Sequence, residues 1–225
     1  MRFVFFTLML LSVMLFSKTG ECMASDWNKA PDCVLEAASQ GLAGYLEKIS
    51  PEEAASYGFS SAEALAETMA RPSFGSPLLL RTIAPAALES YTEGMTLSDL
   101  ISDMELWFVP VLERQRVAAF LVVEQSAKFP CQAVSFGYTH LATDYEATLG
   151  RVGVQRRDKA VLVVVQQARE HFIAFPDDEP GRLYSLRAQM PRNDQGAGED
   201  ESSLSSVIKR LKPVVKANLQ QTEEL

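Results

Sequence analysis

Two different patterns of hydrophobic and polar positions divide the chain. In the first third, apolar residues recur at spacings of three and four, as over residues 32–49, and this spacing is typical of a helix with one buried face. The signature Ser-Pro-Glu-Glu that begins at Ser50 predicts a capping box and a short second helix. Ser60 and Glu63 have the spacing of a second capping box, which predicts a third helix that ends before Pro72. The N-terminal third is therefore expected to consist of helices with well-marked ends.

The middle of the chain contains runs of apolar, β-branched and aromatic residues, which predict strands. Residues 106–112 and 117–124 are separated by a short polar link and predict a β-hairpin. Residues 160–167 contain an unbroken Val-Leu-Val-Val-Val run, which is typical of a central strand covered on both faces. Further strands are expected over residues 77–83, 131–136, 171–175 and 182–186, with short helices over residues 86–91, 96–101 and 138–149.

The C-terminal region combines a polar segment with a helix. Residues 191–203 are polar and acidic and contain glycine, so they are expected to form a flexible linker. Residues 204–225 carry a continuous apolar stripe and predict an amphipathic helix, which Pro213 should kink or interrupt. Helices followed by a run of strands favour an α+β fold, with the N-terminal helices packed on an antiparallel sheet of about five to six strands. We expect a single α+β domain over residues 25–190, followed by the linker and the C-terminal helix.

The first residues have the pattern of an export signal. Arg2 precedes an almost wholly apolar run over residues 3–16, which is shorter than the roughly 20 residues that span a bilayer. Small residues suited to cleavage follow, and a cut after Ala24 makes residues 1–24 a signal peptide. Two alternatives stay open: an uncleaved membrane anchor, and a lipoprotein acylated at Cys22. The expected location is the periplasm or the extracellular space, with no membrane span after cleavage.

Charge and cysteine content narrow the classes of function. The 225 residues include 21 basic and 29 acidic side chains, which gives a net charge of −8. This balance argues against binding to nucleic acid, because phosphates attract a basic surface. After cleavage two cysteines remain, Cys33 and Cys131, and in an oxidising compartment they predict one disulfide that ties the first helix to the sheet. The alternative is two buried thiols that never meet.

Three short motifs carry a family resemblance. They are Tyr-Gly-Phe-Ser-Ser-Ala-Glu from Tyr57, Trp-Phe-Val-Pro-Val from Trp107 and Ala-Val-Ser-Phe-Gly from Ala133. In this order the motifs resemble a group of exported bacterial proteins of unknown function, which have a helical lead-in followed by a W-x-x-P-V strand, a partner strand and an A-x-S-x-G strand. The resemblance covers roughly residues 50–190. It implies an antiparallel meander behind helices and transfers no catalytic residue.

Few residues could carry out catalysis or hold a metal. Cys131, His140 and Asp144 could supply a nucleophile, a base and an orienting acid. Against this hypothesis, Cys131 lies in an expected strand without a helix N-terminus to lower its pKa, and it is the expected disulfide partner. The other histidine is His171, and the acidic residues 177–179 lack EF-hand spacing and are better explained as a solvated turn. We therefore assign no catalytic residue, no cofactor and no metal ligand.

The candidate binding residues are Trp107, Phe108, Tyr138 and His140. Aromatic side chains near the predicted strands can form a binding face, although aromatic residues in strands usually pack in the core. The favoured function is an exported, non-enzymatic binding or interaction module for a protein or peptide, because an exposed strand edge can accept an extended peptide. The alternatives are a periplasmic hydrolase with an unrecognised site and a structural protein associated with the cell envelope.

Overall fold

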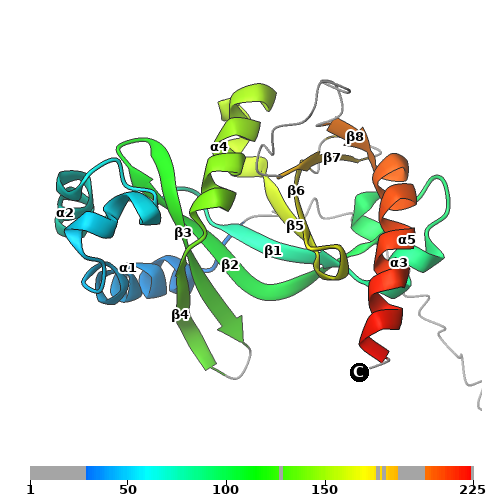
Figure 1. The fold of residues 1–225 in the computed structure, drawn as a ribbon, viewed down its shortest axis with the longest axis horizontal. Helices are drawn as coiled ribbons and strands as arrows, with labels where there is room; N and C mark the ends of the chain where they lie inside the picture. The colour runs from blue at the N-terminus through cyan, green and yellow to red at the C-terminus, as the bar shows by residue number, and fades with distance from the viewer. Residues whose placement is uncertain (1–28, 127–128, 176–177, 179–180, 187–200, 224–225) are drawn as a thin grey trace, which may run out of the picture.

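A single β-sheet organises the computed structural model of the protein (Figure 1). The described residues are 29–126, 129–175, 178, 181–186 and 201–223. The strands are β1 (Leu78–Ile83), β2 (Ile101–Glu113), β3 (Arg116–Ser126), β4 (Phe129–Gly137), β5 (Val161–Val165), β6 (Glu170–Ala174), β7 (Arg182–Ser185) and β8 (Glu201–Ser203). Their order in the sheet is β4-β3-β2-β1-β5-β6-β7-β8. The expected signal peptide lies outside the described residues.

The α+β fold predicted from the sequence is confirmed, but the sheet is larger than the five to six strands expected, and it is mixed. Seven pairs of neighbouring strands make up the sheet, and six of them are antiparallel. The exception is β1 with β5, where Arg81 is in register with Val163 in a parallel pair. The chain leaves the edge strand β4 and returns beside β1, and this long connection makes a parallel pair possible.

Nine helical segments precede, connect or follow the strands of the described chain. They are α1 (Asp32–Leu46), η1 (Pro51–Tyr57), α2 (Ala62–Ala70), α3 (Pro85–Ser90), η2 (Leu97–Asp99), α4 (Thr139–Val152), η3 (Val154–Lys159), η4 (Gln166–Ala168) and α5 (Leu204–Glu223), the η segments being 3-10 helices. The predicted capping box at Ser50 is confirmed, with Glu53 as its second member. The predicted box at Ser60 is wrong: Ser61 caps α2 by accepting a hydrogen bond from the amide of Ala64.

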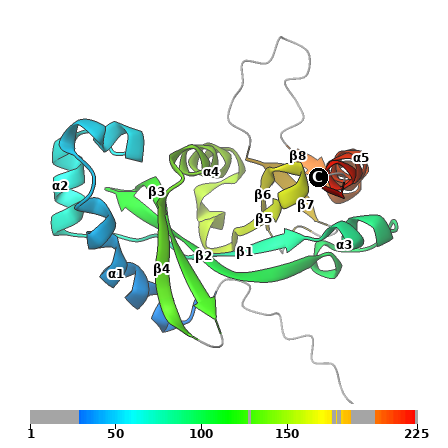
Figure 2. The same ribbon diagram turned by 60° about the horizontal axis from the view of Figure 1, so that its bottom comes forward.

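The helices cover both faces of the sheet (Figures 1 and 2). On one face, α1 packs over β1–β3, and α3 and α5 pack over β5–β7. Leu79 belongs to the core under α1 and Ile83 to the core under α5; both side chains leave β1 on the same side, because they are four residues apart in a strand. Helix α4 covers the opposite face. Every residue of β5 is buried, as its sequence predicted for a central strand.

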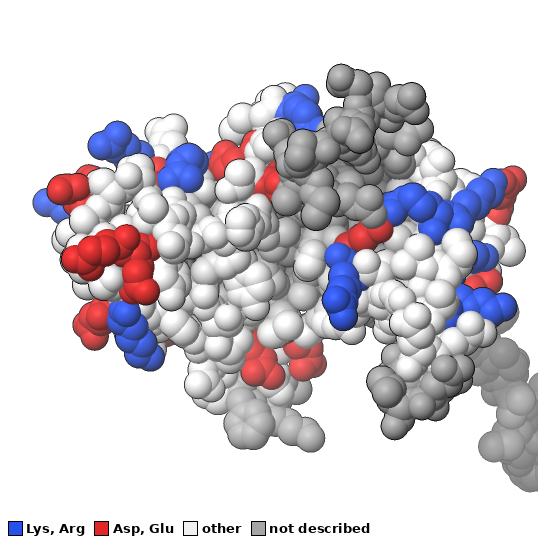
Figure 3. Space-filling view, in the orientation of Figure 1, with Lys and Arg blue, Asp and Glu red and all other residues white. Residues whose placement is uncertain are grey.

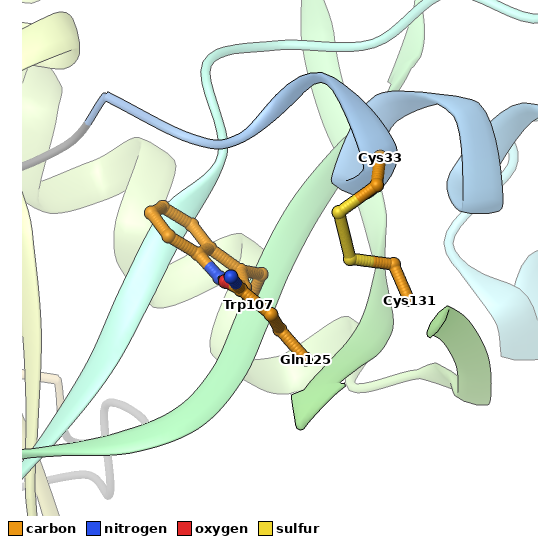
Figure 4. The surroundings of a disulfide bond; sticks show 4 residues. All are labelled: Cys33, Trp107, Gln125 and Cys131. Atoms are coloured by element: carbon orange, nitrogen blue, oxygen red, sulfur yellow. A yellow bond between two sulfur atoms is a disulfide. The ribbon is translucent and has the colours of Figure 1, made fainter. Parts of the chain in front are cut away.

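A disulfide joins Cys33 in α1 to Cys131 in β4, with a Cα–Cα distance of 5.7 Å. The predicted pair is therefore formed, and it ties the first helix to a strand at the edge of the sheet (Figure 4). Farther along the same contact, Gly41 of α1 approaches Ala133 so closely that a Cβ on residue 41 would clash with the alanine Cβ. The disulfide and this close approach together fix α1 against one face of β4.

The C-terminal region differs from its prediction in two ways. Residues 201–203 of the predicted linker form β8, which pairs with β7, while residues 191–200 lie outside the described part of the chain. Helix α5 also runs through Pro213 without a break. Its packing explains this continuity, because Leu211 and Val215, on either side of the proline, are both buried in the core.

Basic side chains of α5 hold it on the protein's own domain. Arg210 donates two hydrogen bonds to the carboxylate of Glu170, at 2.6 and 2.7 Å. Lys209 contacts Glu93 at 2.9 Å. The Glu170 carboxylate is buried, and Arg210 pairs with it through two hydrogen bonds. This bidentate ion pair therefore contributes more to stability than an exposed ion pair does. The amphipathic stripe and the basic residues of α5 are thus both used inside the fold.

Replacing Cys33 and Cys131 together by Ser is expected to lower the free energy of unfolding by about 4–5 kcal/mol. The disulfide bridges a sequence separation of 98 residues, so its loss restores much conformational entropy to the unfolded chain. Urea unfolding of the oxidised protein and the double variant measures the difference. A thiol reductant should destabilise the oxidised wild type and leave the double variant unchanged; equal midpoints for all samples would show that the bond contributes nothing.

Candidate functional site

The four candidate binding residues lie in different environments. Trp107 and Phe108 are successive residues of β2 and point to opposite faces of the sheet, and both are buried. Trp107 donates a hydrogen bond from Nε1 to Oε1 of Gln125, beside the disulfide (Figure 4). Tyr138 and His140 are exposed. Only Phe108 and Tyr138 are in contact, with an edge-to-face arrangement and 5.3 Å between ring centroids, so the four residues do not form one face.

Tyr138 has an unusual backbone conformation. Its φ of 53° is in the left-handed region, and it follows Gly137, whose φ is 124°. Two successive residues with positive φ turn the chain sharply from β4 into α4, and for a tyrosine this costs roughly 1–2 kcal/mol. The turn leaves the Tyr138 side chain 48% exposed while one edge of its ring rests on Phe108. A large aromatic ring is therefore presented to solvent at the end of an edge strand.

The catalytic set considered from the sequence is not formed. The Sγ atom of Cys131 is bonded to Cys33, so it cannot act as a thiolate nucleophile. His140 is exposed on the first turn of α4. The pKa of Asp144 is raised, chiefly by burial, while the nearby His140 and Arg151 act in the opposite direction. His140 and Asp144 thus lack the nucleophile they were proposed to serve.

His171 and Asp178, the remaining polar candidates, are engaged in the packing and hydrogen bonding of the fold. Burial lowers the pKa of His171, which lies in β6 in register with Val164. Asp178 accepts hydrogen bonds from Arg156 at 2.6 Å and from the Tyr184 hydroxyl at 3.4 Å; the other two acids of residues 177–179 lie outside the described chain. Within the residues that are described, no group of three or more His, Cys, Asp or Glu side chains could hold a metal ion. Nor is any helix in that part of the chain sufficiently long and apolar to cross a bilayer.

Strand β4 forms one edge of the sheet and pairs with β3 alone among the described strands. Its pairing contains a bulge, because Ser135 is in register with Val122 and Ala133 with Val123, so that Val134 is inserted between them. Val134 is 41% exposed, whereas Ala133 packs against the core under α1. The edge therefore presents backbone groups that pair with no other strand of the described chain, beside an apolar side chain in solvent.

Aromatic rings flank this edge on both faces of the sheet. On the α1 side, Phe136 stacks on Tyr57 at 6.3 Å and contacts Tyr45 at 6.1 Å between ring centroids, and all three are half-buried. On the α4 side lies Tyr138, in contact with Phe108, and the exposed Val134 projects from the bulge itself. The bulge puts Phe136 on the α1 face: unbroken alternation from Ala133 would put residue 136 on the α4 face, but the inserted residue reverses this. The positive-φ residues Gly137 and Tyr138 then turn the chain, and the Tyr138 ring lies on the α4 side. Sequence reasoning missed Phe136, Tyr45 and Tyr57 because of the bulge.

A buried carboxylate fixes the loop between η1 and α2 near the other end of the β2–β3 hairpin. Burial alone would raise the pKa of Glu113, but hydrogen bonds from Ser60 and Arg116 outweigh it, and the pKa of the carboxyl is lowered. The Ser60 amide donates at 3.0 Å, and Arg116 also donates to the carbonyl of Gly58 at 2.7 Å. The Glu113 carboxylate therefore stabilises this loop, which directly follows Tyr57 in the chain.

Charge is unevenly distributed over the face that carries α4. Figure 3 shows Asp, Glu, Lys and Arg side chains towards the α1–α2 end and towards α5, with an uncharged region between them below α4. Tyr138, in contact with Phe108, is on this side of the sheet.

Comparisons with known proteins found no matching family model, no matching curated protein and no matching solved structure.

Replacing His171 by Gln is expected to flatten the dependence of stability on pH. Because burial lowers the folded-state pKa of His171, the neutral side chain contributes stability that is present above the unfolded-state pKa of about 6.5 and is lost as the pH falls through the folded value. Urea midpoints measured near pH 7.5 and near pH 5 should therefore differ less in His171→Gln than in the wild type. The exposed His140→Gln serves as the control, and an equal pH dependence in wild type and His171→Gln would contradict the assignment.

Proposed function

We propose that this protein is an exported, non-enzymatic module that binds an extended segment of another polypeptide along strand β4. The observation that carries the proposal is an edge strand with half-exposed aromatic rings on both faces of the sheet. A peptide that adds to such an edge gains backbone hydrogen bonds, and its side chains point alternately to the two faces. Each face of β4 offers apolar contacts to one set of those side chains.

On the α1 face, the bound side chains would lie beside Phe136 and the two tyrosines that contact it, Tyr45 and Tyr57. On the opposite face they would lie beside Tyr138, and the exposed Val134 at the bulge would contact the peptide along the edge. Aromatic side chains with few rotatable bonds lose little entropy when they are covered, and they are common among residues that dominate binding energy. The rings thus supply side-chain specificity, and the backbone of β4 supplies general affinity.

The same edge limits pairing with other copies of the chain. The bulge at Val134 interrupts the regular ladder, and Pro130 lacks an amide hydrogen to donate. An irregular edge is a poor template for aggregation, so favourable binding depends on a partner whose side chains fit the rings. Selectivity would therefore come from aromatic and apolar contacts rather than from length of pairing.

Export fits both the N-terminal sequence and the disulfide. Residues 1–24 have the features of a cleavable signal peptide, and the Cys33–Cys131 bond is of the kind that persists in oxidising compartments. In the periplasm or outside the cell the bond would hold α1 against β4 and keep the aromatic rings of the α1 face in position. Such preorganisation reduces the entropy lost on binding.

The proposal is tested by selecting ligands for the oxidised, secreted protein from a displayed library of random twelve-residue peptides. Selected peptides should carry alternating apolar side chains, and their binding should weaken about tenfold or more in Tyr138→Asn and in Val134→Glu. Asparagine tolerates the left-handed backbone of residue 138, so the first variant removes the ring without adding strain. Isothermal titration calorimetry with a synthetic selected peptide measures the affinities.

The matched control is Val154→Glu, because Val154 is 56% exposed but lies in η3, away from β4. This variant should bind the selected peptide as the wild type does. A library that yields no specific peptide, or peptides whose affinity is the same in Tyr138→Asn, Val134→Glu and Val154→Glu, would overturn the proposal.

A further inference from the structure

An open hollow of about 670 Å³ lies between α1 and the segment that connects α2 to β1. Its lining residues are all uncharged: Leu35, Ser39, Pro72, Ser73, Phe74, Gly75, Ser76 and Pro77. Leu35 lies two positions after Cys33, and residues two apart on a helix point in nearly opposite directions. The hollow is therefore on the flank of α1 that faces away from β4, and it is separate from the peptide edge.

Backbone pairing builds the floor of the hollow. The amide of Gly75 donates to the carbonyl of Pro110 at 2.9 Å, and the amide of Leu112 donates to the carbonyl of Ser73 at 2.9 Å. Between them, Phe74 forms an antiparallel bridge with Val111 of β2. These bonds hold the segment as a short extension of the sheet, so the hollow is formed before any ligand arrives.

The opposite wall is also fixed. Leu35 and Ser39 are on α1, which the Cys33–Cys131 disulfide anchors two residues before Leu35. Leu35 is 43% exposed, although its neighbours Val34 and Ala38 are buried in the core. An apolar side chain is thus held at the rim of the hollow by a helix that cannot readily move.

The chemistry of the lining selects against ions. Charged side chains make up 22% of the protein, whose net charge is −8, yet none of them lines this hollow. The apolar surface comes from Leu35, Phe74 and the two prolines, and hydroxyl groups come from serines. Ser76 already contacts Asp158 at 2.5 Å, whereas Ser39 and Ser73 are exposed at the rim. The lining combines apolar and polar surface in comparable amounts, and sites for small molecules typically join apolar contacts to a few hydrogen-bonding groups.

We propose that this hollow binds a neutral small molecule that has a flat apolar part and one or two hydrogen-bonding groups. The apolar part would contact Leu35 and Phe74, and the polar groups would reach the hydroxyls of Ser39 and Ser73. The volume lies within the range of roughly 300–1,000 Å³ found for small-molecule sites. This site uses no residue of β4, so it is independent of the proposed peptide binding.

The test uses Nile red, a neutral solvatochromic dye, as the probe for the oxidised full-length secreted protein. Its emission should shift to the blue and saturate at one dye per chain, whereas the anionic dye anilinonaphthalene sulfonate should not compete. Leu35→Asp is expected to weaken Nile red binding at least about tenfold, because it places a charge on the apolar rim. Ser39→Trp, which fills the hollow from the exposed side of α1, should have the same effect.

The matched control is Met69→Asp, since Met69 is a 41% exposed apolar residue of the neighbouring helix α2 and does not line the hollow. Nile red affinity in this variant should equal that of the wild type. Circular dichroism and the urea midpoint establish that each variant is folded. Absence of saturable binding, or equal losses in Leu35→Asp and Met69→Asp, would overturn the proposal, and neither result bears on the peptide selection.

Discussion

The packing of helix α1 against the edge strand β4 is the contact on which the proposed sites depend. Cys33 is bonded to Cys131 at one end of this contact, and Gly41 lies directly against Ala133 farther along it. The buried side of α1 fills the core over β2 and β3. As a result α1 covers one face of β4 and leaves its outer edge to solvent, and its far flank forms a wall of the hollow.

The bulge in β4 determines what the edge presents. Because of the residue inserted at Val134, Phe136 lies on the same face as Cys131 and Ala133, which is the face that α1 covers. With the bulge, Phe136 turns towards Tyr45 and Tyr57. The strained turn at Tyr138 completes the arrangement on the other face. A bulge and a strained turn thus both lie at the proposed binding edge, and strained residues are common at functional sites.

Local sequence patterns predicted most helices and strands, because these depend on neighbouring residues. The capping box at Ser50 and the continuous apolar run of β5 are examples. The disulfide was predicted because only two cysteines remain after the expected cleavage. The parallel pairing of β1 with β5 depends instead on long-range topology, and β8 has too little apolar character to be recognised as a strand. The helix through Pro213 is maintained by tertiary packing on both sides of it. Local propensity is commonly overridden in this way.

The candidate site was harder to predict than the fold. Tyr138 was named from the sequence as a binding residue, and it is exposed as that role requires. Trp107 and Phe108 were named with it, but each packs in a different core because successive strand residues point to opposite faces. Phe136 and its tyrosine partners were not predicted, because the residue inserted at Val134 reverses the alternation from which the two faces of strand β4 are inferred. The positions of β-bulges are thus the information that the sequence pattern lacked.

Amide hydrogen exchange measured by NMR along β4 tests the central claim most directly. In the free, oxidised protein the amides of residues 131–137 should fall into two classes: slow for those bonded to β3 and fast for those that point away from the sheet. Saturation with a selected peptide should slow the fast class. If the peptide binds while the fast amides of β4 keep their rates and protection increases elsewhere, the partner does not add to this edge, and the account is contradicted.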